Sequence, residues 1–321
     1  MELLKENKSA MSKKADIVII TYNCRDFTLK CIQSLYQYNS QEINDIIIVD
    51  NNSNDDSIEI ISNLFPKIKI IKNPENFGYA KAVNIGMDNA KTDIVIVSNA
   101  DVEYSHNSVR NLLNTFEIDS KIAVTGPQQF YPNEKNQYSW GYTPSLKNVL
   151  IQLFSLSVFS YLIYDKIYRN QEKIIDVSYA DGAVLAIRKS IFDSLNGFDE
   201  VYFFYTEEAD FCYRAKKSGY RVVNNTAAKV THYRGASTTL SGPNEKSVAM
   251  MFDTVYLFCQ KHLSQFQTKY YFRLLLLNYK KIKLIYNFLS KFKSDAVFQS
   301  KIININLYIN ILKKLIKKNG L

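Results

Sequence analysis

Short runs of aliphatic and β-branched residues alternate with longer amphipathic segments along the first two thirds of the chain. Runs of this kind are typical of buried strands, and amphipathic segments between them are typical of connecting helices. The predicted strands are 16–21, 46–49, 68–71, 94–98, 122–125, 174–179, 183–187, 221–223 and 229–233. The predicted helices are 26–38, 79–90, 108–117, 146–168 and 207–217, with helix throughout from 246. This order predicts an α/β fold with a mostly parallel, doubly wound sheet.

Polar side chains follow three of these predicted strands, at Asn23, Asp50 and Asp101. In open α/β sheets the crevice beyond the carboxyl ends of the strands is where ligands bind. The central strand 94–98 runs directly into Asn99 and Asp101. A carboxylate there is suited to Mg²⁺ or Mn²⁺ held mostly by the phosphates of a substrate. The alternative is that Asp101 only caps a helix or turns the chain.

Three carboxylates, Glu207, Glu208 and Asp210, stand at the start of the helix 207–217. Acids at a helix N-terminus are stabilising, so a capping role stays open. Helical spacing places Glu207 and Asp210 on one face and points Glu208 elsewhere. The aromatic residues at 203–205 could desolvate one carboxylate and raise its pKa toward that of a general base.

Two further positions are candidates on weaker patterns. Gly78 lies in a loop that enters a helix, where the backbone can approach an anion closely. His232 ends a predicted strand, and either a structural or a functional role fits it. We expect His106 and His262 to lie on helix surfaces and assign them no role. The chain has no G-x-S-x-G sequence, which excludes a hydrolase of the nucleophile-elbow type.

The formal net charge of +9 is unevenly distributed. Residues 261–321 carry 13 Lys or Arg and one acidic residue, so the part before them is slightly acidic and offers no basic surface for nucleic acid. The four cysteines show no CxxC pair, which indicates reduced thiols in a cytoplasmic protein. Residues 1–14 lack the apolar segment of a signal peptide, and no apolar run has the length of a membrane span.

The basic C-terminal part interleaves apolar residues with lysines. In its last helix Ile305, Ile309, Leu312 and Ile316 form a stripe at helical spacing. Two interpretations stay open. The stripe could pack on the preceding domain as a helical cap, or it could lie on the anionic inner face of the plasma membrane. We therefore divide the chain into a domain at 1–240 and a helical basic region at 241–321.

Seven motifs in a fixed order carry a family resemblance. They are IVIITYN (17–23), VDNNSND (49–55), NPENFGYAKAVNIG (73–86), VSNADV (97–102), DGAVLAIRK (181–189), GFDEVYFFYTEEADFCYR (197–214) and HYRGAS (232–237). Each is weak alone, but together the set resembles glycosyltransferase family 2. It is most similar to the rhamnosyltransferase-like branch that builds bacterial surface polysaccharides.

The resemblance implies an inverting transferase of type A fold that uses a nucleotide-sugar and Mg²⁺ or Mn²⁺. It implies that Asp101 and His232 hold the metal and that Glu208 is the base. Glu208 stands where the family more often has Asp, so Glu207 remains a second candidate. The residues expected to border the donor and the acceptor pocket are Thr21, Tyr22, Asn23, Asp50, Asn52, Gly78, Asn84, Asn99, Asp181 and Gly182.

The expected reaction moves a sugar from dTDP-rhamnose or a UDP-hexose to a glycan acceptor, such as one linked to polyprenyl diphosphate. Metal at Asp101 would neutralise the leaving diphosphate, and a single displacement assisted by one base inverts the anomeric carbon. A non-catalytic scaffold of a polysaccharide-assembly complex is the alternative. A dinucleotide oxidoreductase is disfavoured because the first strand is followed by Thr21-Tyr22-Asn23-Cys24, with no glycine fingerprint.

Overall fold

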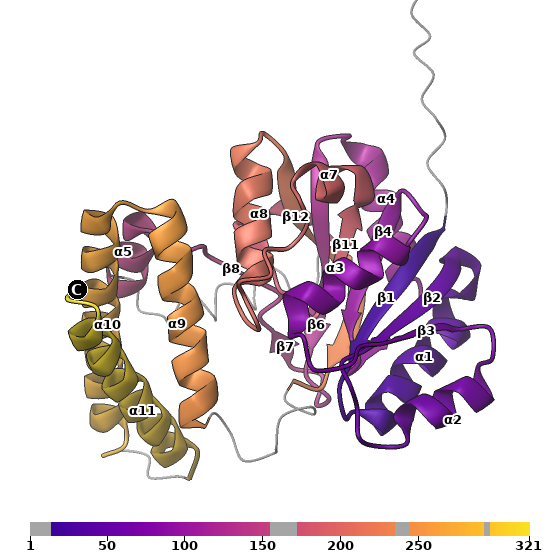
Figure 1. Ribbon diagram of the computed structural model, residues 1–321. Helices are drawn as coiled ribbons and strands as arrows, with labels where there is room; N and C mark the ends of the chain where they lie inside the picture. The colour runs from indigo at the N-terminus through magenta and orange to yellow at the C-terminus, as the bar shows by residue number, and fades with distance from the viewer. Residues whose placement is uncertain (1–13, 155–171, 235–243, 292–295) are drawn as a thin grey trace, which may run out of the picture.

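The computed structural model describes residues 14–154, 172–234, 244–291 and 296–321. A twisted sheet flanked by helices forms one part of the molecule, and a layer of long helices stands beside it (Figure 1). The α/β fold with a mostly parallel sheet and a helical C-terminal region is therefore confirmed.

The main sheet follows the order β3-β2-β1-β4-β11-β6-β12-β5. The first four strands of this order are parallel, as are β6 and β12, whereas β11 runs antiparallel between β4 and β6. The strands are β1 (Ala15–Thr21), β2 (Ile43–Asp50), β3 (Lys69–Lys72), β4 (Ile94–Asn99), β5 (Val102–Tyr104), β6 (Ile122–Phe130), β7 (Asn136–Gln137), β8 (Trp140–Gly141), β9 (Ile174–Asp176), β10 (Tyr179–Ala180), β11 (Val184–Arg188) and β12 (Arg221–His232).

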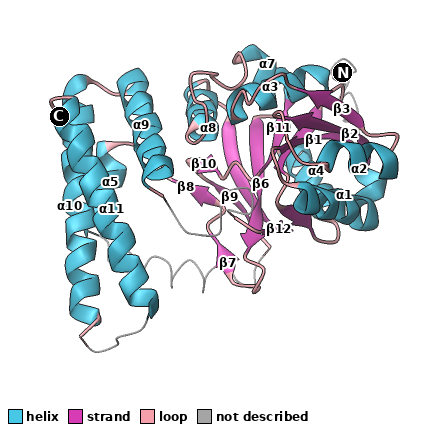
Figure 2. Cartoon of the chain, turned by 60° about the horizontal axis from the view of Figure 1, so that its bottom comes forward, coloured by secondary structure: helices cyan, strands magenta, loops and turns pink. Residues whose placement is uncertain are grey.

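Helices cover both faces of this sheet (Figure 2). One face packs on α1 (Arg25–Asn39), α2 (Ser57–Leu64) and α4 (Ser108–Ile118). The other packs on α3 (Tyr79–Asn89), α7 (Lys189–Ser194) and α8 (Glu207–Lys217). A short 3-10 turn, η1 (Ser40–Glu42), leads into β2. Neighbouring residues of β1 face opposite layers, so the continuous apolar run at its centre is buried on both sides.

The sequence pattern was wrong about some strand boundaries. The two strands expected at 221–223 and 229–233 form one strand, β12, which continues through polar residues and shifts register between Asn225 and Lys229. Asn224 and Asn225 are buried there because their amides bind other backbone and side-chain groups. These polar residues interrupt the apolar pattern, so the sequence predicted two strands where there is one. The expected helix 146–168 is observed as α5 (Leu146–Phe154), and the rest of that range lies outside the described residues.

The helical layer consists of α9 (Glu245–His262), α10 (Gln265–Leu289) and α11 (Ala296–Lys318), joined by α5 from the middle of the chain. Its core buries Val149 of α5 with Phe252, Phe272 and Leu312. Division of the chain at residue 240 stays a prediction, and α5 packs with the helices that follow that point. Within the described residues no helix has the length and apolarity needed to cross a bilayer.

The predicted stripe of α11 faces this core. Ile305, Ile309 and Leu312 are buried, and Ile316 packs on the same cluster. The stripe thus packs mainly against α9 and α10, as a cap would, although within the helical layer rather than on the sheet domain. The same side chains are not available to a membrane.

Candidate active site

The strand register brings the predicted ligand edge together. β1 pairs in parallel with β2 and with β4, so that Thr21 lies opposite Asp50 and Ile20 lies opposite Asn99. Parallel strands end at the same edge of a sheet, and these ends therefore form one row. Thr21 is buried, with its hydroxyl 2.9 Å from that of Thr28 in α1.

A compact loop after β2 closes the first part of this row. The Asp50 carboxylate accepts hydrogen bonds from the Ser53 hydroxyl at 2.5 Å and from the Ser53 backbone N–H at 3.2 Å. Asn23 accepts from the backbone N–H of Asn54 at 2.7 Å. Asn23 and Asn52 both adopt positive φ, at 48° and 67°, a region that asparagine tolerates better than most residues. Tyr22 stays 39% exposed beside the loop.

Asn51, which the sequence reasoning missed, connects this loop to the start of α3. Its side-chain amide donates to the Gly78 carbonyl at 3.0 Å and accepts from Asn73 at 2.8 Å. Gly78 has φ 80°, and a Cβ there would collide with the carbonyl of Phe203. The following residue, Tyr79, donates its backbone N–H to that same carbonyl at 2.7 Å. Gly78 is therefore required by the close approach of the segment that precedes α8.

Asp101 and His232 lie side by side because β5 and β12 are paired strands. Val102 is the register partner of His232, and the Asp101 carbonyl accepts from the Tyr233 backbone N–H at 3.0 Å. The His232 Nε2 atom lies 3.4 Å from Asp101 Oδ1, and both side chains are buried. The two predicted metal ligands are thus neighbours.

Two buried glutamines fix the orientation of the His232 ring. Its Nδ1 lies 3.1 Å from Gln129 Oε1 and 2.9 Å from Gln137 Oε1. The amide nitrogen of Gln129 donates to Asp181 at 3.1 Å, and that of Gln137 donates to the His232 carbonyl at 3.1 Å. These bonds turn both amide oxygens toward Nδ1, which must then carry the ring proton. Nε2 is the ring nitrogen left facing Asp101, where a metal ligand would be needed.

Asp181 and Gly182 connect this centre to the acidic helix. Asp181 accepts from Gln129 and forms an ion pair with Arg234 at 3.1 Å. A Cβ placed on Gly182 would lie 3.5 Å from the Glu208 side chain. The Gly182 carbonyl accepts from the Tyr79 hydroxyl at 2.7 Å. The segment from Asp181 to Gly182 therefore lies against the side chain of Glu208.

The carboxyl groups of Glu207 and Glu208 both lack full hydrogen-bond satisfaction. One oxygen of each is buried without a partner among the described residues. Burial, followed by the charge of Glu208, raises the pKa of Glu207 well above its usual range. Burial, followed by the charge of Asp181, raises the pKa of Glu208 to about 7. Burial therefore favours the protonated form of both carboxyl groups more than in an exposed glutamate.

Asp210 is held by partners of its own, and the expectation that it shares a helix face with Glu207 stays a prediction. It binds Arg214 at 2.7 Å, His262 at 2.6 Å and the Tyr202 hydroxyl at 3.3 Å. Burial opposes its ionisation, but the hydrogen bonds from His262 and Arg214 prevail and lower its pKa to about 2. These strong ion-pair partners decide the direction in which Asp210 points.

Asn84 also lies apart from the other predicted donor residues. Its amide exchanges two hydrogen bonds with the backbone of Phe198, at 2.8 and 2.9 Å. It therefore anchors the turn before α8, and a direct donor contact for Asn84 stays a prediction. Asn52 lies in the loop beside Asp50, and Asn99 lies at the end of β4, where its backbone N–H donates to Ala183 at 2.9 Å.

Comparison with known proteins decides the family. The model of "Glycosyl transferase family 2" matches residues 16–195, more than half of the chain and all of the strand-end row. The chain belongs to glycosyl transferase family 2. The family predicted from the seven motifs is thereby confirmed.

Two relatives within the family show which kinds of glycosyltransferase this chain is similar to. An N-acetylglucosaminyl-diphospho-decaprenol L-rhamnosyltransferase of Mycobacterium tuberculosis is 26% identical, over 71% of this chain and 78% of its own. A low-salt glycan biosynthesis hexosyltransferase of Haloferax volcanii is 22% identical, over 67% of this chain and 66% of its own. The rhamnosyltransferase-like character predicted from the sequence is confirmed.

Solved structures support the fold of the glycosyltransferase. The mannosyltransferase PcManGT from Pyrobaculum calidifontis, in complex with GDP-Man and Mn²⁺, superposes with a TM-score of 0.61 over 94% of this chain and 86% of its own, at 10% identity. GalNAc-T7 with UDP, GalNAc and Mn²⁺ superposes with a TM-score of 0.57 over 75% of this chain, at 16% identity. The chain spans 47% of the length of GalNAc-T7.

Proposed function

We propose that this glycosyltransferase moves a sugar from a nucleotide diphosphate sugar to a hydroxyl of a lipid-linked glycan, with inversion at the anomeric carbon. The candidate donors are dTDP-rhamnose and the UDP-hexoses. The candidate acceptor is a saccharide on polyprenyl diphosphate, at the cytoplasmic face of the plasma membrane. The mycobacterial relative is named as a rhamnosyltransferase that acts on a diphospho-decaprenol acceptor. That name supports rhamnose as the donor sugar and a lipid-linked diphosphate as the acceptor.

The observation that carries this proposal is the placement of Glu208. One of its carboxylate oxygens is buried with no partner in the described part of the chain, its side chain lies against Gly182, and its pKa is raised to about 7. A general base works best when its pKa lies near the working pH. Glu208 would accept the proton of the acceptor hydroxyl as that oxygen attacks the anomeric carbon. A single base of this kind gives inversion, whereas double displacement needs a carboxylate nucleophile.

Glu207 has a different part from Glu208 in this proposal. Burial raises the pKa of Glu207 well above its usual range, which favours the protonated form of its carboxyl group. A protonated carboxyl group donates a hydrogen bond and cannot act as a base. In this proposal Glu207 orients a sugar hydroxyl, and Glu208 removes the proton.

The loop after β2 would hold the nucleoside. Asp50 is fixed by Ser53 at the end of its strand, with Tyr22 exposed beside it. A carboxylate can accept the ring N–H of uracil or thymine, and an aromatic side chain can stack on the flat base. In this proposal Thr21, Asn23 and Asn52 would border the base beside Asp50. Asn99, next along the row, would reach the ribose and diphosphate.

The residues around Asp101 fit a divalent metal ion. Two ligand atoms at about 2.1 Å from an octahedral ion are about 3 Å apart, close to the 3.4 Å between Asp101 Oδ1 and His232 Nε2. The described residues contain no group of three or more His, Cys, Asp or Glu that could hold a metal. Mg²⁺ and Mn²⁺ in nucleotide sites commonly use one or two protein ligands and complete their shells with phosphate and water. Bound there, the metal would neutralise charge on the leaving diphosphate.

A turnover assay separates this proposal from a non-catalytic scaffold. The full chain is incubated with Mn²⁺, each candidate nucleotide-sugar and a short-chain N-acetylglucosaminyl diphospholipid, and release of nucleoside diphosphate is measured. We expect release with one donor, at least 100-fold above the Glu208→Gln variant. Release no faster than in that variant with every donor, together with no stabilisation by any nucleotide, would support the scaffold instead.

A further inference from the structure

The outward side of α10 is apolar along most of its length. Phe266, Tyr270, Leu277 and Leu284 are 63%, 42%, 50% and 69% exposed. These four residues are called the α10 stripe below. The same helix buries Phe272 and Leu275 on its other side, against α9 and α11. α10 is therefore apolar on two opposite faces, although only one of them has a partner among the described elements.

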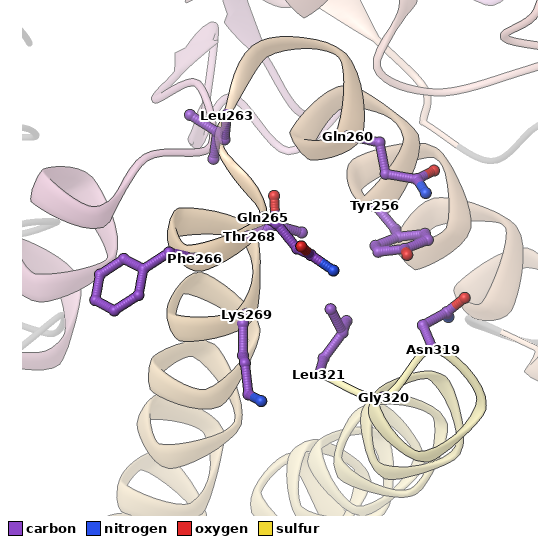
Figure 3. A pocket seen from close by; sticks show the side chains of 10 residues that line it. All are labelled: Tyr256, Gln260, Leu263, Gln265, Phe266, Thr268, Lys269, Asn319, Gly320 and Leu321. Atoms are coloured by element: carbon purple, nitrogen blue, oxygen red, sulfur yellow. The ribbon is translucent and has the colours of Figure 1, made fainter.

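Helical spacing places the α10 stripe on one narrow surface. Its members are separated by four, seven and seven residues. At 3.6 residues per turn they fall within about 40° around the helix axis and extend along about 27 Å of it. The Phe266 and Tyr270 rings pack on each other, with centroids 4.3 Å apart. In Figure 3 Phe266 points away from the pocket that it borders with Tyr256, Leu263 and Leu321.

Only cations accompany this stripe along its helix. Helix α10 carries five Lys or Arg residues and no Asp or Glu. Arg273 and Lys280 lie about 20° and 40° from one edge of the stripe, on its two middle turns, and both are exposed. Arg273 also donates a hydrogen bond to the Leu321 carbonyl at 3.4 Å. The neighbouring helix α11 also has no acidic residue. An apolar strip with cations along one edge and no acidic residue on its helix is complementary to an anionic bilayer surface, where each nearby cation contributes attraction.

We propose that the α10 stripe and its basic border form a docking surface for an anionic lipid bilayer. This moves the membrane contact from the α11 residues, which are buried, to an exposed face of α10. The biological purpose of such docking rests on the proposed lipid-linked acceptor, but binding to vesicles without any acceptor measures the surface itself.

Co-sedimentation of the full chain with vesicles tests the surface. The vesicles contain either 30% anionic phosphatidylglycerol in phosphatidylcholine or phosphatidylcholine alone. The stripe variant is Leu277→Ser with Leu284→Ser. The matched control is Leu64→Ser with Ile118→Ser, which removes two equally exposed apolar side chains from the sheet domain. We expect binding to anionic vesicles only, lowered at least tenfold in the stripe variant and unchanged in the control.

A charge variant, Arg273→Gln with Lys280→Gln, gives an independent readout. We expect this variant to bind anionic vesicles more weakly than wild type. We also expect its binding to depend less on salt concentration. Circular dichroism melts identify any variant that fails to fold, and transfer to a water-soluble acceptor checks the catalytic centre separately. Equal sedimentation of wild type and stripe variant would overturn the proposal. A wild-type dimer by light scattering that the stripe variant converts to monomer, with no vesicle binding by either, would assign the stripe to a second copy and also overturn it.

Discussion

The Asp210 carboxylate lies 2.6 Å from His262 Nε2, and this contact joins the helix that carries the acidic pair to the helical layer. Asp210 follows Glu208 by two residues in α8, and His262 ends α9. Arg214 holds the second oxygen of Asp210 and also binds the carbonyl groups of Leu195 and Gly197. The start of α8 is therefore held from both sides.

Removal of His262 should destabilise the protein and disturb the acidic pair. His262→Ala leaves a buried carboxylate with one fewer donor, at a cost of about 2 kcal/mol in unfolding free energy. We also expect kcat to fall while the KM for the donor changes little, since the donor pocket lies elsewhere. Chemical denaturation and steady-state kinetics measure both, with His106→Ala, at an exposed position, as the control. An unchanged kcat would make the contact purely structural.

Asp210 should also make the free energy of unfolding depend on pH in the acid range. Because its pKa in the folded protein is lowered to about 2, its contribution is present above the unfolded value near 4. The contribution is lost as the pH falls from about 4 to about 2. Denaturation of wild type and Asp210→Asn across this range should show a difference in unfolding free energy that shrinks with acid. A constant difference would contradict the assignment.

The raised pKa of Glu208 predicts an acid limb in the rate profile. A base must be ionised, so kcat/KM should fall tenfold per pH unit below about 7. The charge of Asp181 contributes to that pKa after burial, so Asp181→Asn should move the limb to lower pH whatever it does to the maximal rate. A limb that stays in place in this variant would show that another group titrates.

Gln129 and Gln137 should act through His232 on the apparent affinity for metal. Gln129→Leu with Gln137→Leu removes the acceptors that fix the ring proton on Nδ1. Loss of such supporting bonds typically costs 10- to 100-fold in metal affinity. When transfer activity is titrated with Mn²⁺, the half-saturating concentration of the double variant should rise by the same factor. The control Gln260→Leu, on α9, should leave that concentration unchanged. If the two curves coincide, the glutamines do not orient a ligand.

The strand-end row could be predicted from the sequence because it depends on local pattern. Continuous apolar runs specified the buried strands. The carboxyl ends of parallel strands meet at one edge, which grouped Asn23, Asp50 and Asp101 from the sequence, and the observed register places Thr21, Asp50 and Asn99 at that edge. The proximity of Asp101 and His232 depends on a pairing between strands about 130 residues apart, and only the family resemblance indicated it.

Other features depend on tertiary contacts that no local pattern encodes. Gln129 and Gln137 lie between the predicted strand 122–125 and the predicted helix 146–168, where no element was expected. They contact His232 only because β6, β7 and β12 lie in one sheet. His262 has the spacing of a surface residue, but its side chain is only 11% exposed and binds Asp210 of α8. Two interpretations were open for the α11 stripe, a membrane surface and packing on the preceding domain, and the stripe is observed to pack on α9 and α10 instead. The exposed α10 stripe was hidden because α10 has apolar residues on both sides.

The rate of sugar transfer by Glu208→Gln, compared with Glu207→Gln at saturating donor and Mn²⁺, tests the central claim most directly. Both substitutions preserve side-chain size, and nucleotide-induced thermal shifts check that donor binding persists. The account predicts that Glu208→Gln lowers kcat by about 10²- to 10⁴-fold, as loss of a general base does. It predicts a much smaller effect for Glu207→Gln, whose amide can still donate a hydrogen bond. Near-normal kcat in Glu208→Gln, with the large loss in Glu207→Gln, would contradict it.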